Sequence, residues 1–147
     1  MPAKMRWFVA FSSLTFVAGF CLGNLFQPAS VVHAQASGRV FELRTYTTYE
    51  GKLDDLLARF RNHTTKLFEK HGMTNIGYWV PADAPRSQNT LIYVLAHPSR
   101  EAAAKSWAGF RADPEWVKVS TESEAQGKIN EKVESVFMNP TDFSRLR

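Results

Sequence analysis

Cysteine is almost absent from this sequence of 147 residues: Cys21 is the single one, and it lies in an apolar segment near the N-terminus. The rest of the chain therefore has no thiol for a disulfide, a redox pair or a cysteine nucleophile. Glycine loops of the GxGxxG or P-loop type are missing, and so are the HExxH and GxSxG motifs. These absences argue against dinucleotide, nucleotide, zinc-protease and serine-hydrolase functions.

An excess of charge of one sign is also lacking. The chain has 18 basic and 14 acidic residues, and two of the basic ones, Lys4 and Arg6, precede the apolar N-terminal segment. The remaining 16 basic against 14 acidic residues leave a balance of +2 without a basic run, so we expect no nucleic-acid partner. No histidine stands four residues from another histidine or a cysteine, so we expect no metal ion, and we expect no cofactor either.

The N-terminal segment has the pattern of an export signal. Two basic residues come before residues 7–26, which carry no charge, and small residues follow at Ala34 and Ala36. This order predicts that residues 1–36 are a signal peptide and that residues 37–147 form an exported domain, periplasmic or secreted. About 20 apolar residues also span a bilayer, so retention of residues 7–26 as a membrane anchor is the alternative.

After this segment, apolar periodicity predicts a strand, helix, strand order that occurs twice. The first strand covers residues 39–46 and the second residues 73–80, and the helix between them has apolar residues at i, i+3, i+4 and i+7. A third strand covers residues 90–97, a helical region with a break near Asp113 follows, and the last strand lies near residues 131–138. The order βαββαβ predicts an α+β, ferredoxin-like fold with a four-stranded antiparallel sheet.

The composition of the third strand indicates whether the sheet is covered on both faces. Residues 91–96 are apolar apart from the Tyr93 hydroxyl, and a strand without polar alternation is typically buried on both faces. Because the helices cover one face of the sheet, we expect a second layer to cover the other.

The first strand has one apolar and one polar face. We expect the apolar face, with Phe41 and Leu43, to meet the helices, and the polar face, with Glu42, Arg44 and Tyr46, to point toward the second layer. There the charged pair can orient a polar ligand, with Arg44 as donor to an anion or a carbonyl group. The alternative is a salt-bridge ladder at an interface.

Three other residues are candidates for a ligand site. His63 lies on the flank of the first helix, where a boundary position against the core is the alternative. Trp79 and Trp107 are suited to line an apolar pocket for a planar ligand, although aromatic residues also dominate ordinary cores. We expect His71 instead to stabilise the C-terminus of the first helix.

Several short blocks carry a family resemblance: FELRTY at 41–46, LFEKHGM at 67–73, IGYW at 76–79 and DPEW at 113–116. In this order they resemble the NIPSNAP family, which belongs to the dimeric α+β barrel superfamily. The resemblance covers about residues 40–146 and implies a homodimer in which two sheets face each other. It implies no particular catalytic residue.

Two classes of function follow. The first is a non-catalytic, exported, homodimeric module that binds a small apolar or aromatic ligand, or a protein. The second, implied through the wider superfamily, is an enzyme similar to the cofactor-independent monooxygenases.

We predict that the mature protein begins at Ser37, because the Ala34-Gln35-Ala36 ending directs cleavage after Ala36. Intact-mass spectrometry of the protein isolated from its native cells measures this directly. A complete N-terminus would instead support the membrane anchor.

Overall fold

The computed structural model describes residues 38–147, so the predicted signal segment lies outside the described residues. The elements in chain order are β1 (Val40–Thr48), α1 (Leu53–Arg59), the π-helical turn η1 (Phe60–Thr64), α2 (Thr65–Lys70), β2 (Thr74–Trp79), the 3-10 turn η2 (Arg86–Gln88), β3 (Thr90–His97), α3 (Arg100–Ala112), α4 (Pro114–Ser123) and β4 (Asn130–Met138). Between residues 38 and 147, no helix combines the length and hydrophobicity needed to span a membrane.

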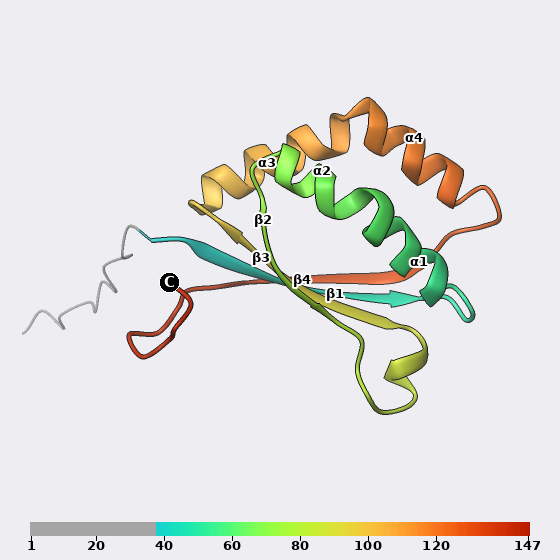
Figure 1. Ribbon diagram of the computed structural model, residues 1–147, viewed down its shortest axis with the longest axis horizontal. Coiled ribbons are helices and arrows are strands. Elements are labelled where there is room, and N and C mark those ends of the chain that lie inside the picture. The colour runs from blue at the N-terminus through green and yellow to red at the C-terminus, as the bar shows by residue number, and fades with distance from the viewer. Residues whose placement is uncertain (1–37) are drawn as a thin grey trace, which may run out of the picture. The chain divides into compact units, whose positions relative to one another are not determined.

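The four strands form one antiparallel sheet in the order β2-β3-β1-β4. The helices lie together on one face of this sheet, and none of the described helices covers the other face (Figure 1). The βαββαβ order and the antiparallel sheet confirm the predicted α+β, ferredoxin-like fold.

The helical segment between β1 and β2 buries one continuous stripe. Phe60 and Thr64, one turn apart in η1, are 5% and 1% exposed, so Thr64 fills the gap between the apolar residues on either side. The Thr64 hydroxyl donates to the carbonyl oxygen of Arg59 at 3.2 Å. The segment ends at Gly72, whose φ of +75° is the left-handed conformation that commonly terminates helices.

The second helical region begins and breaks where the sequence predicts. Ser99 accepts a hydrogen bond from the Ala102 backbone N–H at the start of α3, and Asp113 accepts one from the Glu115 N–H at the start of α4. The other carboxylate oxygen of Asp113 lies 2.7 Å from Nε2 of His71, so His71 links the end of α2 to this break.

The core lies between the helices and one face of the sheet. Its central residue is Tyr93 of β3, whose ring packs against Tyr46, Phe60, Phe68 and Tyr78. Aromatic side chains from the sheet and from the helices therefore form most of the contact between the two layers.

The predicted orientation of β1 is wrong. Tyr46 packs edge-on against Phe60, and Glu42 accepts a hydrogen bond from the Trp107 ring of α3, so Glu42, Arg44 and Tyr46 face the helices. Since side chains alternate along a strand, Phe41 and Leu43 lie on the opposite face. The prediction assumed that polar side chains point away from the helices. In the structure, side chains from other elements form hydrogen bonds with them, so they can face the helices.

The face of the sheet opposite the helices is apolar over part of its area, and the ion pair of Lys132 with Glu134 of β4 lies on the same face. Phe41, Ile76, Trp79, Val94 and Met138 line a groove of about 330 Å³ there, and residues 139–141, 144 and 146 of the C-terminal tail form its other wall. We call this surface the open face. Val136 of β4, opposite Leu43 in the ladder, is 55% exposed on it.

Candidate functional site

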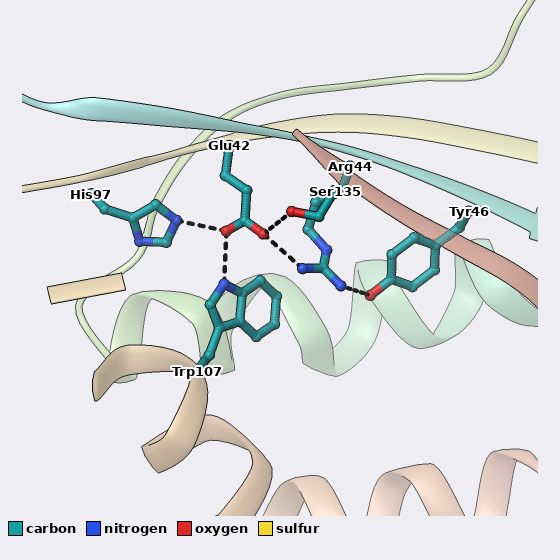
Figure 2. Close-up of polar contacts among 6 residues, drawn as sticks. All are labelled: Glu42, Arg44, Tyr46, His97, Trp107 and Ser135. Carbon is teal, nitrogen blue, oxygen red and sulfur yellow. Dashed lines mark hydrogen bonds and ion pairs between the residues drawn. The ribbon is translucent and has the colours of Figure 1, made fainter. Parts of the chain in front are cut away.

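A buried carboxylate organises the space between sheet and helices. Oε1 of Glu42 accepts hydrogen bonds from Arg44 Nη1 at 2.7 Å and from the Ser135 hydroxyl at 2.6 Å. Oε2 accepts from Trp107 Nε1 at 2.7 Å and from His97 Nε2 at 3.0 Å. Figure 2 shows these four donors, which come from β1, β4, α3 and β3, converging on one side chain.

The Glu42 side chain is ionised at neutral pH although it is only 2% exposed. Burial by itself raises the pKa of Glu42, but the hydrogen bonds from His97, Ser135, Trp107 and Arg44 together lower it to about 2. All four lone-pair positions of the carboxylate are occupied, so Glu42 has no free position from which to act as a base.

Arg44 balances the charge of Glu42 and extends the network. Its guanidinium lies 4.3 Å from the centre of the Trp107 ring, and Nη2 donates to the Tyr46 hydroxyl at 3.3 Å. Burial by itself lowers the pKa of Arg44, but Tyr46, Tyr93 and Glu42 raise it above its ordinary value. The Glu42, Arg44 and Tyr46 side chains thus form a chain of polar contacts along β1, as Figure 2 shows.

His97 has a defined tautomer. An ionised carboxylate can only accept hydrogen bonds. Nε2 of His97 therefore carries a proton and donates it in the hydrogen bond to Glu42. Nδ1 is buried and has no hydrogen-bond partner within the described chain. His97 therefore orients and stabilises the Glu42 carboxylate.

A small aromatic cavity lies next to Tyr46. It has a volume of about 110 Å³, and its lining comes from the sheet and the helices: Tyr46, Arg59, Phe60, Thr64, Phe68, Phe110, Trp116, Ser120, Glu124 and Asn130. Arg59 is 5% exposed, lies 5.4 Å from the Trp116 ring centre and pairs with Glu124 at 3.2 Å. We call this space the inner cavity.

The structure brings four of the six predicted site residues together. Glu42, Arg44, Tyr46 and Trp107 share one network, and Tyr46 also lines the inner cavity. Two candidates lie elsewhere. His63 is exposed and lines a surface groove of about 590 Å³ between α1, η1 and α4, while Trp79 is 53% exposed on the open face.

Sequence analysis missed His97 and Ser135 of the network, and Arg59 and Asn130 of the cavity. The pairing of the strands indicates the positions of His97 and Ser135. Ser135 is paired with Arg44 across β1 and β4, and His97 with Val40 across β1 and β3, which places both side chains on the face of Glu42. Arg59 gave no such signal, because a cation beside an apolar helical stripe ordinarily lies at the surface. Between residues 38 and 147, no cluster of His, Cys, Asp or Glu has the composition of a metal site.

The fold and the network define a class: a ferredoxin-like α+β domain with a buried ion pair and an aromatic cavity between its layers. The chain belongs to the NIPSNAP family, whose family model matches residues 41–145. No curated protein matches the chain.

Solved structures share this fold. A NIPSNAP family protein of unknown function from Agrobacterium tumefaciens is 23% identical, covering 76% of this chain and 96% of its own, with a TM-score of 0.66. A second NIPSNAP family protein from the same species is 25% identical, with coverages of 74% and 99% and a TM-score of 0.65. A monooxygenase from Streptomyces coelicolor, solved with the ligand nanaomycin D, is 13% identical, with coverages of 71% and 89% and a TM-score of 0.51.

We predict that Glu42→Gln destabilises the protein by about 3–5 kcal/mol at pH 7, because it leaves the buried Arg44 charge without its partner. The double variant Glu42→Gln/Arg44→Met regains part of this loss, since it removes both charges. Urea denaturation measures both values. Asp55→Asn, which breaks the exposed Lys52 ion pair, is the matched control and costs about 1 kcal/mol or less.

The same network sets a dependence on pH. The pKa of Glu42 lies below its ordinary value of 4.5, so its stabilisation is present above pH 4.5 and is lost as the pH falls toward 2. Glu42→Gln therefore flattens the acid limb of the stability curve. An acid limb of unchanged steepness in this variant, or an Arg44→Met protein with unchanged melting temperature, would contradict the role given to the pair.

Proposed function

We propose that this protein is an exported, homodimeric module that binds a small aromatic ligand between its sheet and its helices. The observation that supports binding is the inner cavity itself, where the rings of Tyr46, Phe60, Phe68, Phe110 and Trp116 surround an unfilled space. The cavity is partly open, and Ser120 and Glu124 line it together with the rings, so it lies at the edge of the densely packed core. Ligand sites combine such apolar walls with a few polar groups.

The inner cavity is suited to one aromatic ring. A cavity of about 150 Å³ lined by apolar side chains binds benzene in another protein, and the inner cavity is slightly smaller. Arg59 lines both the inner cavity and the surface groove that contains His63. A side-chain movement of Arg59 would therefore open a route from that groove to the cavity.

We favour binding over catalysis because the charged groups near the cavity are already engaged. Arg59 is paired with Glu124, and Arg44 with Glu42. A carboxylate that acts as a general base must be free to accept a substrate proton, and both carboxylates in these pairs are already engaged. The fold likeness to a monooxygenase supplies no such group.

The dimer part of the proposal rests on the open face. Val94 and Val136 lie on it, and Trp79 and Val136 are each more than half exposed although the face is apolar. Large apolar side chains exposed on a sheet face commonly mark an interface. A second copy of the chain that presents the same face would cover it with two-fold symmetry.

We predict that toluene binds to the full-length protein and that Ser120→Leu weakens its binding about tenfold or more, because the larger side chain fills the inner cavity. Thr121→Leu is the matched control: both hydroxyls donate to the Val117 carbonyl oxygen, but Thr121 does not line the cavity. Ligand-observed NMR gives the dissociation constants. Failure of toluene to bind, or an equal loss in both variants, would refute binding in this cavity.

We predict that the protein without residues 1–36 is a dimer at micromolar concentration and that Val136→Lys weakens the dimer roughly 100-fold or more, because it places an unpaired charge in the interface. Val117→Lys on α4 starts from a similar exposure, 50% against 55%, and leaves the dimer intact. Light scattering over a concentration series measures both. A monomeric parent protein would exclude the dimer.

A further inference from the structure

The C-terminal tail presents an exposed aromatic ring. Phe143 is 84% exposed, more than any other large hydrophobic side chain among residues 38–147. It lies in a turn that is closed by a hydrogen bond of 3.1 Å from the Ser144 backbone N–H to the Thr141 carbonyl oxygen. The Ser144 hydroxyl also donates to the Leu146 carbonyl oxygen at 2.9 Å. Hydrogen bonds within the tail thus hold the segment that carries the ring.

The ring lies beside the groove of the open face but not in it. Thr141 and Ser144, on either side of Phe143 in the chain, line that groove. Figure 1 shows the tail as a loop on the side of the sheet away from the helices. Because Phe143 is almost fully exposed, its ring points away from the groove of its own chain. A second copy that covers the open face would therefore meet this ring at the rim.

The groove itself is suited to an aromatic side chain. A side chain added at Gly77 would collide with the Trp79 ring, so the indole lies flat against the Gly77 backbone and leaves its other side accessible. Aromatic rings pack well on such a surface in offset-stacked or edge-on arrangements. A cavity of about 150 Å³ holds benzene in another protein, and the groove has about 330 Å³. A phenyl ring therefore fits beside Trp79.

One chain thus carries both an exposed ring and a groove that accepts a ring. In an interface with two-fold symmetry the same patch of each copy meets the other, so a complementary pair of features forms two identical contacts. The charges on this face agree with a second copy as the partner. Lys132 and Glu134 of β4 pair with each other at 2.8 Å, so their charges cancel and two such faces do not repel.

We infer that the C-terminal tail holds the dimer together, with Phe143 of each copy in the open-face groove of the other. This inference rests on the proposed dimer and adds to it the residue that anchors the partner and the groove that receives it. Aromatic side chains that enter a pocket of the partner commonly dominate the affinity of an interface.

The first test removes the ring. We expect Phe143→Ala to weaken the dimer of the full-length protein about 100-fold or more, because each dimer loses two aromatic anchors. Tyr49→Ala is the matched control, since the Tyr49 ring is 46% exposed but does not line the groove, and it changes the dissociation constant by no more than about twofold. Sedimentation velocity over a concentration series measures both.

A stability measurement separates the interface from the fold. In the Val136→Lys background, where the dimer is weakened, we expect Phe143→Ala to leave the melting temperature unchanged, because the ring of a single chain is exposed to water. A lower melting temperature there would show that the ring packs within its own chain, and it would overturn the inference.

The second test places the ring and the groove on different chains. Val94→Phe puts a ring in the groove, so this variant keeps Phe143 but cannot receive it, whereas Phe143→Ala keeps the groove and lacks the ring. Neither variant alone forms the contact, but a mixed dimer forms it once. We expect the mixed dimer to be about tenfold or more tighter than the dimer of either variant, and native mass spectrometry distinguishes the three species by mass.

The outcomes separate this inference from the proposed dimer. A dimer that Val136→Lys weakens and Phe143→Ala does not, or a mixture without preference for the mixed dimer, overturns the role of the tail and leaves the proposed dimer intact. A parent protein that is monomeric overturns both.

Discussion

Glu42 holds a full negative charge where water does not reach, and the arrangement of the core follows from the way that charge is satisfied. Removing an ion from water is costly, so a buried carboxylate persists only when hydrogen bonds and an opposite charge replace its hydration. The four donors to Glu42 come from three strands and a helix. One side chain therefore fixes the position of α3 over the sheet and the register of β1 between β3 and β4.

The network also determines the chemistry next to it. Since Glu42 holds Arg44, the guanidinium lies against Trp107 and directs Nη2 at the Tyr46 hydroxyl. A phenol that accepts a bond from a cation becomes a stronger donor through its own hydrogen. Tyr46 thus links the ion pair of Glu42 and Arg44 to the inner cavity. Tyr46 lines the cavity, whereas Glu42 and Arg44 do not.

Local patterns in the sequence predicted the fold because local forces determine those features. The third strand was placed correctly at residues 90–97, and the caps at Ser99 and Asp113 depend on residues two or three positions away. The site depends on distant residues: Glu42 is 55 positions from His97, 65 from Trp107 and 93 from Ser135. A charged strand residue whose partners are so remote resembles a surface residue, which is why β1 was predicted with the wrong face toward the helices.

The position of the inner cavity has a cause in the backbone. On the helical side it is bordered by Phe60 and Thr64, the first and last residues of the π-helical turn, and on the sheet side by Asn130, where the pairing of β1 and β4 shifts after Thr47. A π turn widens a helix locally, and a shift in register bends a strand away from its neighbour. Side chains interdigitate well between regular helices and strands. Here the helix and the sheet both depart from regular geometry at the same place, and a gap remains between the rings of Tyr46 and Phe110. Both irregularities are frequent at functional sites, so their meeting at one void supports the proposed ligand site at this end of the core rather than at the Glu42 end.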